Sequence, residues 1–262
     1  MKMMSLKKAA LALTLLVSAT AQAGVVKVWG EQISGPTLNT INSFYNSLAG
    51  HSSTIGVGTL DTVNLTGVNL LWASQPSDAY TPAELIAMQS FLASGGRIAF
   101  LGEHGTISPN ENNRINAALA ALGSTISINN VILDSGFRTA SVGDGQILAH
   151  PLTSGVNNYE YAAFAPLSVS GSAVALMLGE DSYLGQPSVM MAYQNIGAGS
   201  IFLITDQNVF DHSSTNWGGA FSNGRMFENL LVGNTQVPEP GSMALLALGV
   251  AGLYAARRRK AK

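Results

Sequence analysis

The alternation of strand-like and helix-like segments in the first half of the chain constrains the fold more than any other feature. Short apolar runs rich in β-branched residues predict strands, and stretches with apolar residues three or four positions apart predict helices. Repeated alternation of this kind is typical of a parallel sheet with helices on both faces. The predicted strands are 25–30, 54–60, 69–74 and 97–103, and the predicted helices are 37–49, 81–93 and 110–122.

One of these helices is marked at both ends. Thr81 and Glu84 have the spacing of a capping box, Pro82 occupies the first helical position, and Gly95 with Gly96 ends the helix. The preceding strand, NLLWAS, is apolar on both faces, as a central parallel strand is. Trp72 in that strand is therefore expected in the core.

The second half predicts a β-rich elaboration of the same domain. Its strand-like pieces are separated by Gly, Ser and Asn, and a hairpin is expected before a closing helix. The chain has no cysteine, so a single apolar core must hold the domain 24–233 together. The predicted pieces are 124–128, 131–134, 146–149 and 173–179, followed by strands 188–194 and 200–206 around the turn 195–199 and by the helix 222–232.

The two ends of the chain have the composition of targeting segments. Residues 1–23 combine lysines, an apolar run and small residues closing on Ala21 and Ala23, which predicts a signal peptide that signal peptidase cuts after Ala23. An uncleaved N-terminal anchor is the alternative, although the apolar run is short for one. After a linker at 234–240, the apolar stretch 241–256 would form a helix of about 24 Å, a marginal transmembrane span. The basic residues of 257–262 would keep that end cytoplasmic and the body outside.

The order of parts in the tail resembles a known sorting signal. Val237, Pro238, Glu239 and Pro240 precede the short apolar helix and the Arg-rich end, as in the PEP-CTERM signals of Gram-negative bacteria. The resemblance implies recognition and processing by an exosortase at the Pro-Glu-Pro motif. It further implies transient insertion of 241–256 in the inner membrane and delivery to the cell surface or extracellular matrix, where an exopolysaccharide or a matrix protein is a possible partner. An ordinary single-pass tail is the alternative.

The charge of the body differs from that of the whole chain. Residues 24–240 carry five basic and 15 acidic side chains, a net charge of −10, whereas the whole chain has a formal charge of −2. Nucleic acids and anionic lipids bind clustered Lys and Arg. The acidic body therefore argues against both as partners.

The order of the predicted elements, with the motif His150-Pro151-Leu152-Thr153-Ser154-Gly155-Val156, resembles the class I glutamine amidotransferase-like architecture. That resemblance implies an α/β, flavodoxin-like three-layer sandwich with a mainly parallel central sheet. The family places a catalytic Cys on the turn after the central strand, where this chain has Gly102-Glu103-His104-Gly105. Glutamine hydrolysis through a Cys thiolate is therefore excluded.

Polar residues follow the predicted strands, where open parallel sheets build their sites. Glu103 and His104 could act as a general base and its orienting partner if His212 converged on them. The alternative is a tight turn between Gly102 and Gly105 with a purely structural role. No arrangement of these side chains is visible in the sequence, so both interpretations stay open.

The loop after the last strand is the densest polar stretch. Asp206, Asn208, Asp211 and His212 could ligate a divalent cation, with oxygen ligands suiting Ca²⁺ and His212 suiting a transition metal. The alternative is that Asp206 caps the turn leaving its strand and the other residues are solvated.

Other residues at strand ends complete the candidate set. His150 precedes a proline and is expected to cap a backbone group. The strand-end candidates are Trp29, Glu31, Ser74 and Gln75. Trp29 and Trp217 could stack on a sugar ring, and the alternative is a half-buried aromatic at the base of a loop. The leading hypothesis is a non-enzymatic binding module, and the rival is a metal-assisted or Glu/His-dependent hydrolase of a small or glycan substrate. Convergence of Glu103, His104, Asp206 and His212 on one pocket would favour the hydrolase.

Overall fold

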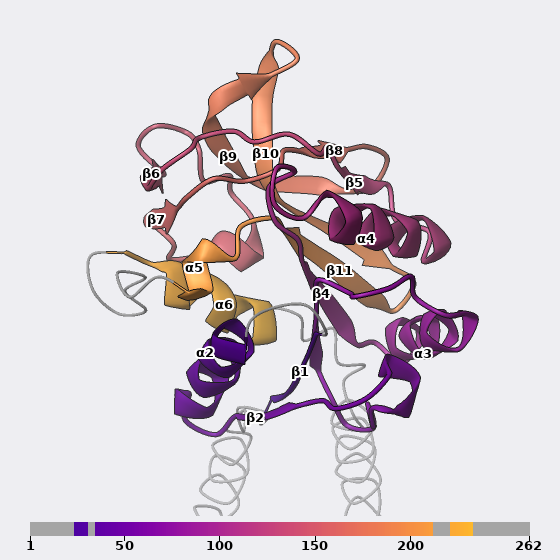
Figure 1. Cartoon of the computed structure of the whole chain (residues 1–262). Helices are drawn as coiled ribbons and strands as arrows, with labels where there is room; N and C mark the ends of the chain where they lie inside the picture. Colours follow the sequence, from indigo (N-terminus) through magenta and orange to yellow (C-terminus); the bar gives the residue numbers. More distant parts are fainter. Residues whose placement is uncertain (1–23, 31–34, 212–220, 233–262) are drawn as a thin grey trace, which may run out of the picture.

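The parallel strands of the first half form one side of a large sheet (Figure 1). The structure is a computed structural model that describes residues 24–30, 35–211 and 221–232. Its parallel strands follow the order β2-β1-β3-β4-β11. They are β1 (Val25–Gly30), β2 (Ser52–Ile55), β3 (Leu70–Ser74), β4 (Arg97–Leu101) and β11 (Gly199–Ile204).

Antiparallel strands of the second half continue the same sheet. β11 forms the predicted hairpin with β10, which also pairs with β8 and β9, and β8 pairs with β5. The β-rich elaboration is thus confirmed, as an extension of the central sheet. Its strands are β5 (Ile126–Ile128), β8 (Leu167–Val169), β9 (Val174–Tyr183) and β10 (Gln186–Ile196), with β6 (Arg138–Ser141) and β7 (Asn158–Tyr161) as a separate antiparallel pair.

The helices lie on both faces of the parallel half. Ile41 of α2 and Phe227 of α6 share one apolar cluster with Trp72, whereas Met88 of α3 and Ile115 of α4 belong to the cluster on the other face. Successive side chains of a strand point to opposite faces, so the central strands supply both clusters. The helices are α2 (Gly35–Ser47), α3 (Pro82–Ala93), α4 (Pro109–Ala121), α5 (Asn208–Asp211) and α6 (Asn223–Val232).

The core extends through every position of the central strands. All residues of β3, β4 and β11 are buried, and Trp72 is 0% exposed, as predicted. The Trp72 ring meets Phe227 of α6 at a centroid distance of 5.7 Å. Burying a large apolar side chain contributes about 1.5–3 kcal/mol to the free energy of unfolding. The apolar core therefore provides the stability that disulfides provide in many other exported domains.

The predicted capping box of α3 is present. The Thr81 Oγ1 accepts a hydrogen bond from the Glu84 backbone N–H at 3.2 Å, and Glu84 Oε2 accepts one from the Thr81 N–H at 2.8 Å. The other oxygen, Oε1, accepts the Leu60 N–H at 3.0 Å. Glu84 therefore caps the helix and also fixes the chain that crosses between β2 and β3.

Several predicted strand segments are wrong in whole or in part, and the strands predicted at 97–103 and 200–206 end early, at Leu101 and Ile204. β2 ends at Ile55, and Leu60–Thr62 forms a short 3-10 helix, because Gly58 turns the chain at φ +84° and the Leu60 N–H bonds to Glu84. The segments 131–134 and 146–149 form only isolated bridges, through Leu133 and Ile147. The strands β6 and β7 were not predicted, since their sequences lack a long apolar run.

Candidate functional site

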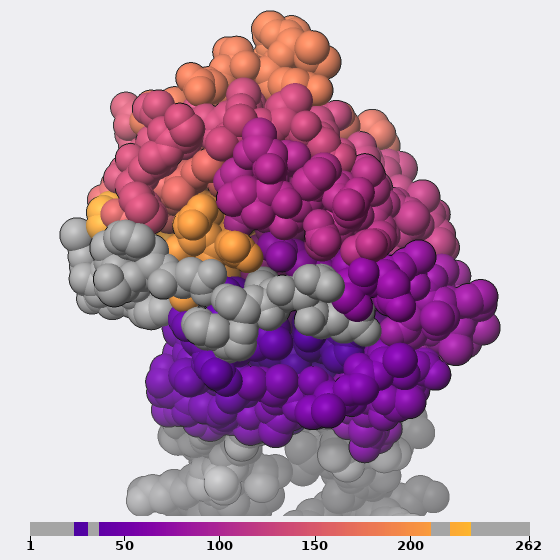
Figure 2. Space-filling model, in the orientation of Figure 1, coloured from indigo at the N-terminus to yellow at the C-terminus, as the bar shows by residue number. Residues whose placement is uncertain are grey.

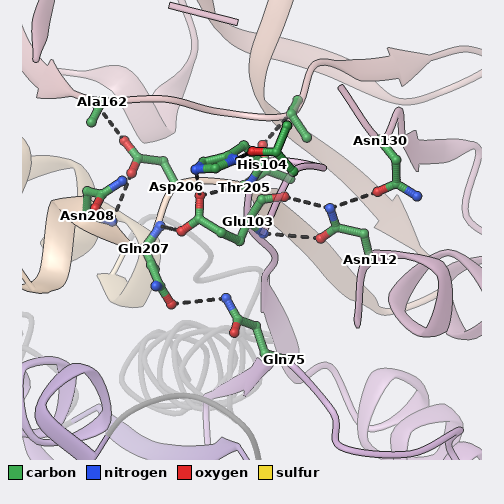
Figure 3. Close-up of polar contacts among 12 residues, drawn as sticks. Gln75, Glu103, His104, Asn112, Asn130, Ala162, Thr205, Asp206, Gln207 and Asn208 are labelled. Carbon is green, nitrogen blue, oxygen red and sulfur yellow. Dashed lines mark hydrogen bonds and ion pairs between the residues drawn. The ribbon is translucent and has the colours of Figure 1, made fainter. Parts of the chain in front are cut away.

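The carboxyl ends of β3, β4 and β11 meet at one edge of the sheet, and the polar residues that follow them lie together there (Figure 3). Ser74 and Gln75 follow β3, Glu103 and His104 follow β4, and the segment 205–208 follows β11. Parallel strands place such residues side by side because their ends align. The structure therefore brings these polar residues together at one edge, and their role as a functional site stays a prediction.

Glu103 links the turn after β4 to the turn after β11. Its side chain is 1% exposed, Oε1 accepts the His104 N–H at 2.8 Å, and Oε2 accepts the Gln207 N–H at 3.1 Å. Charge-assisted bonds of this kind are stronger than neutral ones. The carboxylate is thus engaged by the backbone of two turns.

Asn112 of α4 holds the backbone of Glu103 from the other side. Its Oδ1 accepts the Glu103 N–H at 3.1 Å, and its Nδ2 donates to the Glu103 carbonyl at 2.6 Å and to Asn130 Oδ1 at 2.9 Å. Asn112 is 0% exposed, so its side-chain amide has these protein groups as hydrogen-bond partners in place of water. Nothing in the sequence distinguishes Asn112 from its polar neighbours in α4, and its role was not predicted.

The turn itself requires glycine. A Cβ on Gly105 would lie 2.2 Å from the backbone carbonyl carbon of Asn130, and one on Gly102 would lie 2.7 Å from Asn112 Oδ1. These contacts are much shorter than van der Waals distances. The chain therefore makes a tight turn between Gly102 and Gly105. This turn was the alternative to a catalytic Glu103–His104 pair in the sequence analysis.

His104 is 7% exposed and lies beside Glu103. Its Nδ1 is 2.8 Å from Thr106 Oγ1, and its Nε2 is 3.7 Å from Glu103 Oε1, which is longer than a hydrogen bond. Burial lowers the pKa of His104. The imidazole and the carboxylate are neighbours, but no direct hydrogen bond joins them as it would in a base and its orienting partner.

Asp206 points away from Glu103, toward the chain between β7 and β8 (Figure 3). Its Oδ2 accepts the Ala162 N–H at 2.7 Å, and its Oδ1 accepts the Asn208 N–H at 2.9 Å. The side chain is 0% exposed, and burial raises its pKa to about 6 although these hydrogen bonds lower it. Asp206 thus caps the turn leaving β11 and also joins it to the β-rich half.

Gln75 and Gln207 connect the ends of β3 and β11. Gln75 Nε2 donates to Gln207 Oε1 at 3.1 Å, and Gln75 has a φ of +27°, a conformation that L-residues rarely adopt. Ser74 is 0% exposed, and among the residues that the structure describes its Oγ has no hydrogen-bond partner. Gln207 was not among the predicted site residues, because its partners lie far away in the sequence.

The remaining sequence-based candidates have mixed outcomes. Trp29 is 1% exposed and donates from Nε1 to the Gly58 carbonyl at 2.9 Å, so it is a buried aromatic and does not offer its ring to a sugar. His150 accepts the Leu152 N–H at Nδ1, 3.1 Å away, and is a cap as predicted. Glu31, His212 and Trp217 lie outside the described residues, as does the side chain of Asp211.

Two of the four predicted metal ligands, Asp206 and Asn208, have side chains that the structure describes. Within residues 24–30, 35–211 and 221–232, no three His, Asp or Glu side chains are grouped as metal ligands. Asp206 lies two positions before Asn208, the first residue of α5, but both oxygens of Asp206 accept backbone N–H groups. A cation site on Asp206, Asn208, Asp211 and His212 stays a prediction.

The C-terminal tail matches a known protein family. Residues 236–260 match the family model described as the PEP-CTERM protein-sorting motif. The chain carries an exosortase sorting signal. The motif supports export and a membrane-anchored precursor processed by an exosortase, but it covers about a tenth of the chain and assigns nothing to the body. In the part of the chain that the structure describes, no helix has the length and apolar character to cross a membrane, and 241–256 lies outside that part.

Solved structures with a similar fold cover most of the body. The "mmIFT52 N-terminal domain" aligns with a TM-score of 0.58 at 19% identity, over 78% of this chain and 94% of that one. The cytoplasmic protein STM1381 from Salmonella typhimurium LT2 aligns with a TM-score of 0.56 at 12% identity, over 79% and 98%. No curated protein matches the sequence significantly. At these identities the similarity concerns the fold alone, and neither protein is named as a glutamine amidotransferase, so that resemblance stays a prediction.

Proposed function

We propose that the protein is an exported, surface-delivered binding module whose body has no catalytic activity. Its ligand would be a component of the extracellular matrix, an exopolysaccharide or a matrix protein. The sorting motif supports the route, and the resemblance of the body to a flavodoxin-like amidotransferase fold without its Cys supports a non-enzymatic role.

The non-enzymatic proposal rests on the burial and the hydrogen bonds of two carboxylates, those of Glu103 and Asp206. Each oxygen of Glu103 and of Asp206 accepts a backbone N–H, and the side chains are 1% and 0% exposed. A general acid or base must reach the substrate directly or through one water. These carboxylates instead hold turns together.

The route to the surface involves two cuts. Cleavage after Ala23 leaves Gly24 as the first residue, and the first strand begins at Val25, so the cut preserves the whole fold. The Gly24 nitrogen lies 2.9 Å from His51 Nδ1, where a new amino terminus would keep its partner. The exosortase would then act at Pro238-Glu239-Pro240 and release the body from 241–256 and 257–262.

Intact-mass measurement of the protein collected from the cell surface tests the route. The expected species begins at Gly24 and lacks Met243–Lys262. Replacement of Glu239 by Ala should leave an uncut, membrane-associated precursor, while Glu228→Ala on the exposed side of α6 serves as a control that is processed normally. A surface form that retains the tail would contradict the proposal.

Hydrolysis is the second candidate, because the pKa of Asp206 lies at about 6, within the range of general acids and bases. Chromogenic glycosides and esters, tested from about pH 5 to about pH 8, distinguish the two candidates. The binding module should show no turnover and should cosediment with matrix polysaccharide or matrix protein from the producing cells. Turnover that disappears in a folded Glu103→Gln or Asp206→Asn variant would favour the hydrolase.

A further inference from the structure

The chain enters and leaves the described body at one end of the molecule. Gly24 and Leu231 lie side by side, since a Cβ on Gly24 would be 2.8 Å from Leu231 Cδ1. The Gly24 carbonyl accepts the Ser52 N–H at 3.0 Å, so both ends lie beside β2, which is an edge strand of the sheet. The turn between β9 and β10, which contains Leu184, is at the opposite end (Figures 1 and 2).

The surface around β2 is continuous across three elements. Asn46 of α2 donates from Nδ2 to the Ser53 carbonyl at 3.0 Å, and its Oδ1 accepts the Ser53 N–H at 2.8 Å. Lys27 of β1 donates from Nζ to Thr54 Oγ1 at 2.6 Å. We call Lys27 and the exposed residues of this surface the base: Asn46, Ser47, Ala49, Gly50, Ser52, Thr54, Val57, Gly58 and Thr59.

The charge of the base is opposite to that of the rest of the body. In residues 24–30 and 35–60, Lys27 is the only Lys, Arg, Asp or Glu, and it is also the only lysine of the body 24–240. The other residues of the body include four arginines and 15 acidic side chains. Asp61 is the first acidic residue of the chain beyond the base. The end of the body from which the tail leaves is therefore its least acidic part.

The tail is short compared with the body. The sorting motif supports a membrane-anchored precursor, and only residues 233–240 separate α6 from the apolar stretch 241–256. Eight extended residues span at most about 29 Å. A domain of this length is about 40 Å across. The base therefore lies within reach of the bilayer that holds the anchor, whereas the turn at Leu184 does not.

We infer that the base lies on the phospholipid headgroups of the membrane while the precursor is anchored. This inference rests on the proposed route, in which 241–256 inserts in the inner membrane. Lys27 would donate to lipid phosphates, and the hydroxyl and amide groups of the base would share hydrogen bonds with the headgroups. Anionic lipids repel acidic surfaces, so the remainder of the body turns away from the bilayer.

The contact depends on the tether. A single lysine gives a weak attraction, but a short linker holds the base at an effective concentration of about millimolar near the headgroups. The exosortase cut removes that tether. The released body would then leave the membrane, although none of its own surface had changed.

Fluorescence quenching by spin-labelled headgroups tests the orientation, because the chain has no cysteine that would compete for the label. The full-length chain is labelled at Val57→Cys or at Leu184→Cys and inserted in vesicles of phosphatidylethanolamine with a minor share of phosphatidylglycerol. Val57 is 86% exposed and Leu184 is 83% exposed, so the two positions are matched. Quenching should be several-fold stronger at position 57, and equal or stronger quenching at position 184 would overturn the inference.

Two changes test the causes of the contact. Lys27→Glu should lower the quenching at position 57, whereas Arg225→Glu makes the same change of charge at the start of α6, outside the base, and should not. Insertion of about 20 Gly and Ser residues after Gln236 should also lower the quenching, because the effective concentration falls with linker length. Quenching that neither Lys27→Glu nor the longer linker lowers would contradict the inference.

Flotation of the same vesicles separates this inference from the proposed route. A chain that does not float with the lipid has no anchor, which overturns the route and the inference together. A chain that floats but is quenched equally at both positions overturns the inference alone. Protection of position 57 that requires exosortase in the membrane would assign the base to the protease and not to lipid, which also overturns it.

Discussion

Titration of Asp206 should make the protein less stable at neutral pH than in mild acid. Burial raises the pKa of this carboxyl from 3.8 to about 6. The folded protein therefore holds the proton where the unfolded chain has released it, and stability falls as the pH rises through this window. A shift of about two pKa units at about 1.4 kcal/mol each corresponds to a loss of about 3 kcal/mol.

Two histidines act in the opposite direction. Burial lowers the pKa of His104 and of His150, so each contributes stability that increases as the pH rises toward its unfolded value. A pH profile of the wild type alone would mix these contributions. The Asp206→Asn variant removes one of them and leaves both histidines, so the difference between the two proteins isolates the carboxyl.

The assay is urea unfolding of the mature wild type and of Asp206→Asn from about pH 4 to about pH 7.5. The variant loses one acceptor for a buried N–H, which is a cost that does not depend on pH. Over this range the wild type should lose about 2.5 kcal/mol relative to the variant. A difference between the two proteins that stays constant with pH would refute the raised pKa and the assignment of Asp206 as a buried turn cap.

Three further predictions concern the turns around the candidate site and are measured by urea unfolding. Gly105→Ala should cost about 1–3 kcal/mol because its Cβ would meet the Asn130 backbone at 2.2 Å, whereas Gly143→Ala, with Ser141 Oγ at 3.6 Å, should be nearly neutral; equal effects would contradict the clash. Asn112→Ala should cost about 2–4 kcal/mol because it leaves buried groups of Glu103 unpaired, and a loss below about 1 kcal/mol would argue against that role. Thr81→Ala should cost about 1 kcal/mol by removing the α3 cap, and Thr81→Ser should restore most of it; equal stability of the two variants would contradict this.

The parts of the fold that were predicted correctly depend on neighbouring residues. The capping box at Thr81 and the apolar run around Trp72 are short patterns whose meaning is local, and each strand–helix unit adds its strand beside the previous one. The hairpin of β10 and β11 is local too. The errors concern residues whose conformation depends on partners far away in the sequence. Leu60 leaves the strand conformation because its N–H donates to Glu84, which belongs to another element.

The meeting of polar residues at the ends of β3, β4 and β11 was also predictable, because parallel strands end at one edge. The function of their side chains was not. Glu103 and His104 look like a catalytic pair in the sequence, but the partner of Glu103 Oε2 is Gln207, 104 positions away. Trp29 lies at a strand end, where it could have met a sugar, yet Gly58, 29 positions away, accepts its indole N–H and the side chain is buried.

By itself, the sequence determined the sorting of the protein and the order of its elements. The motif at 236–260 is recognised from consecutive residues, and strand or helix periodicity is likewise visible in neighbouring residues. Only the tertiary structure decided that Glu103 and Asp206 are buried and hold turns together, and that Leu184 is 83% exposed. Hydrogen-bond partners and burial are set by residues brought together from distant parts of the chain, as Asp206 and Ala162 are across 44 positions.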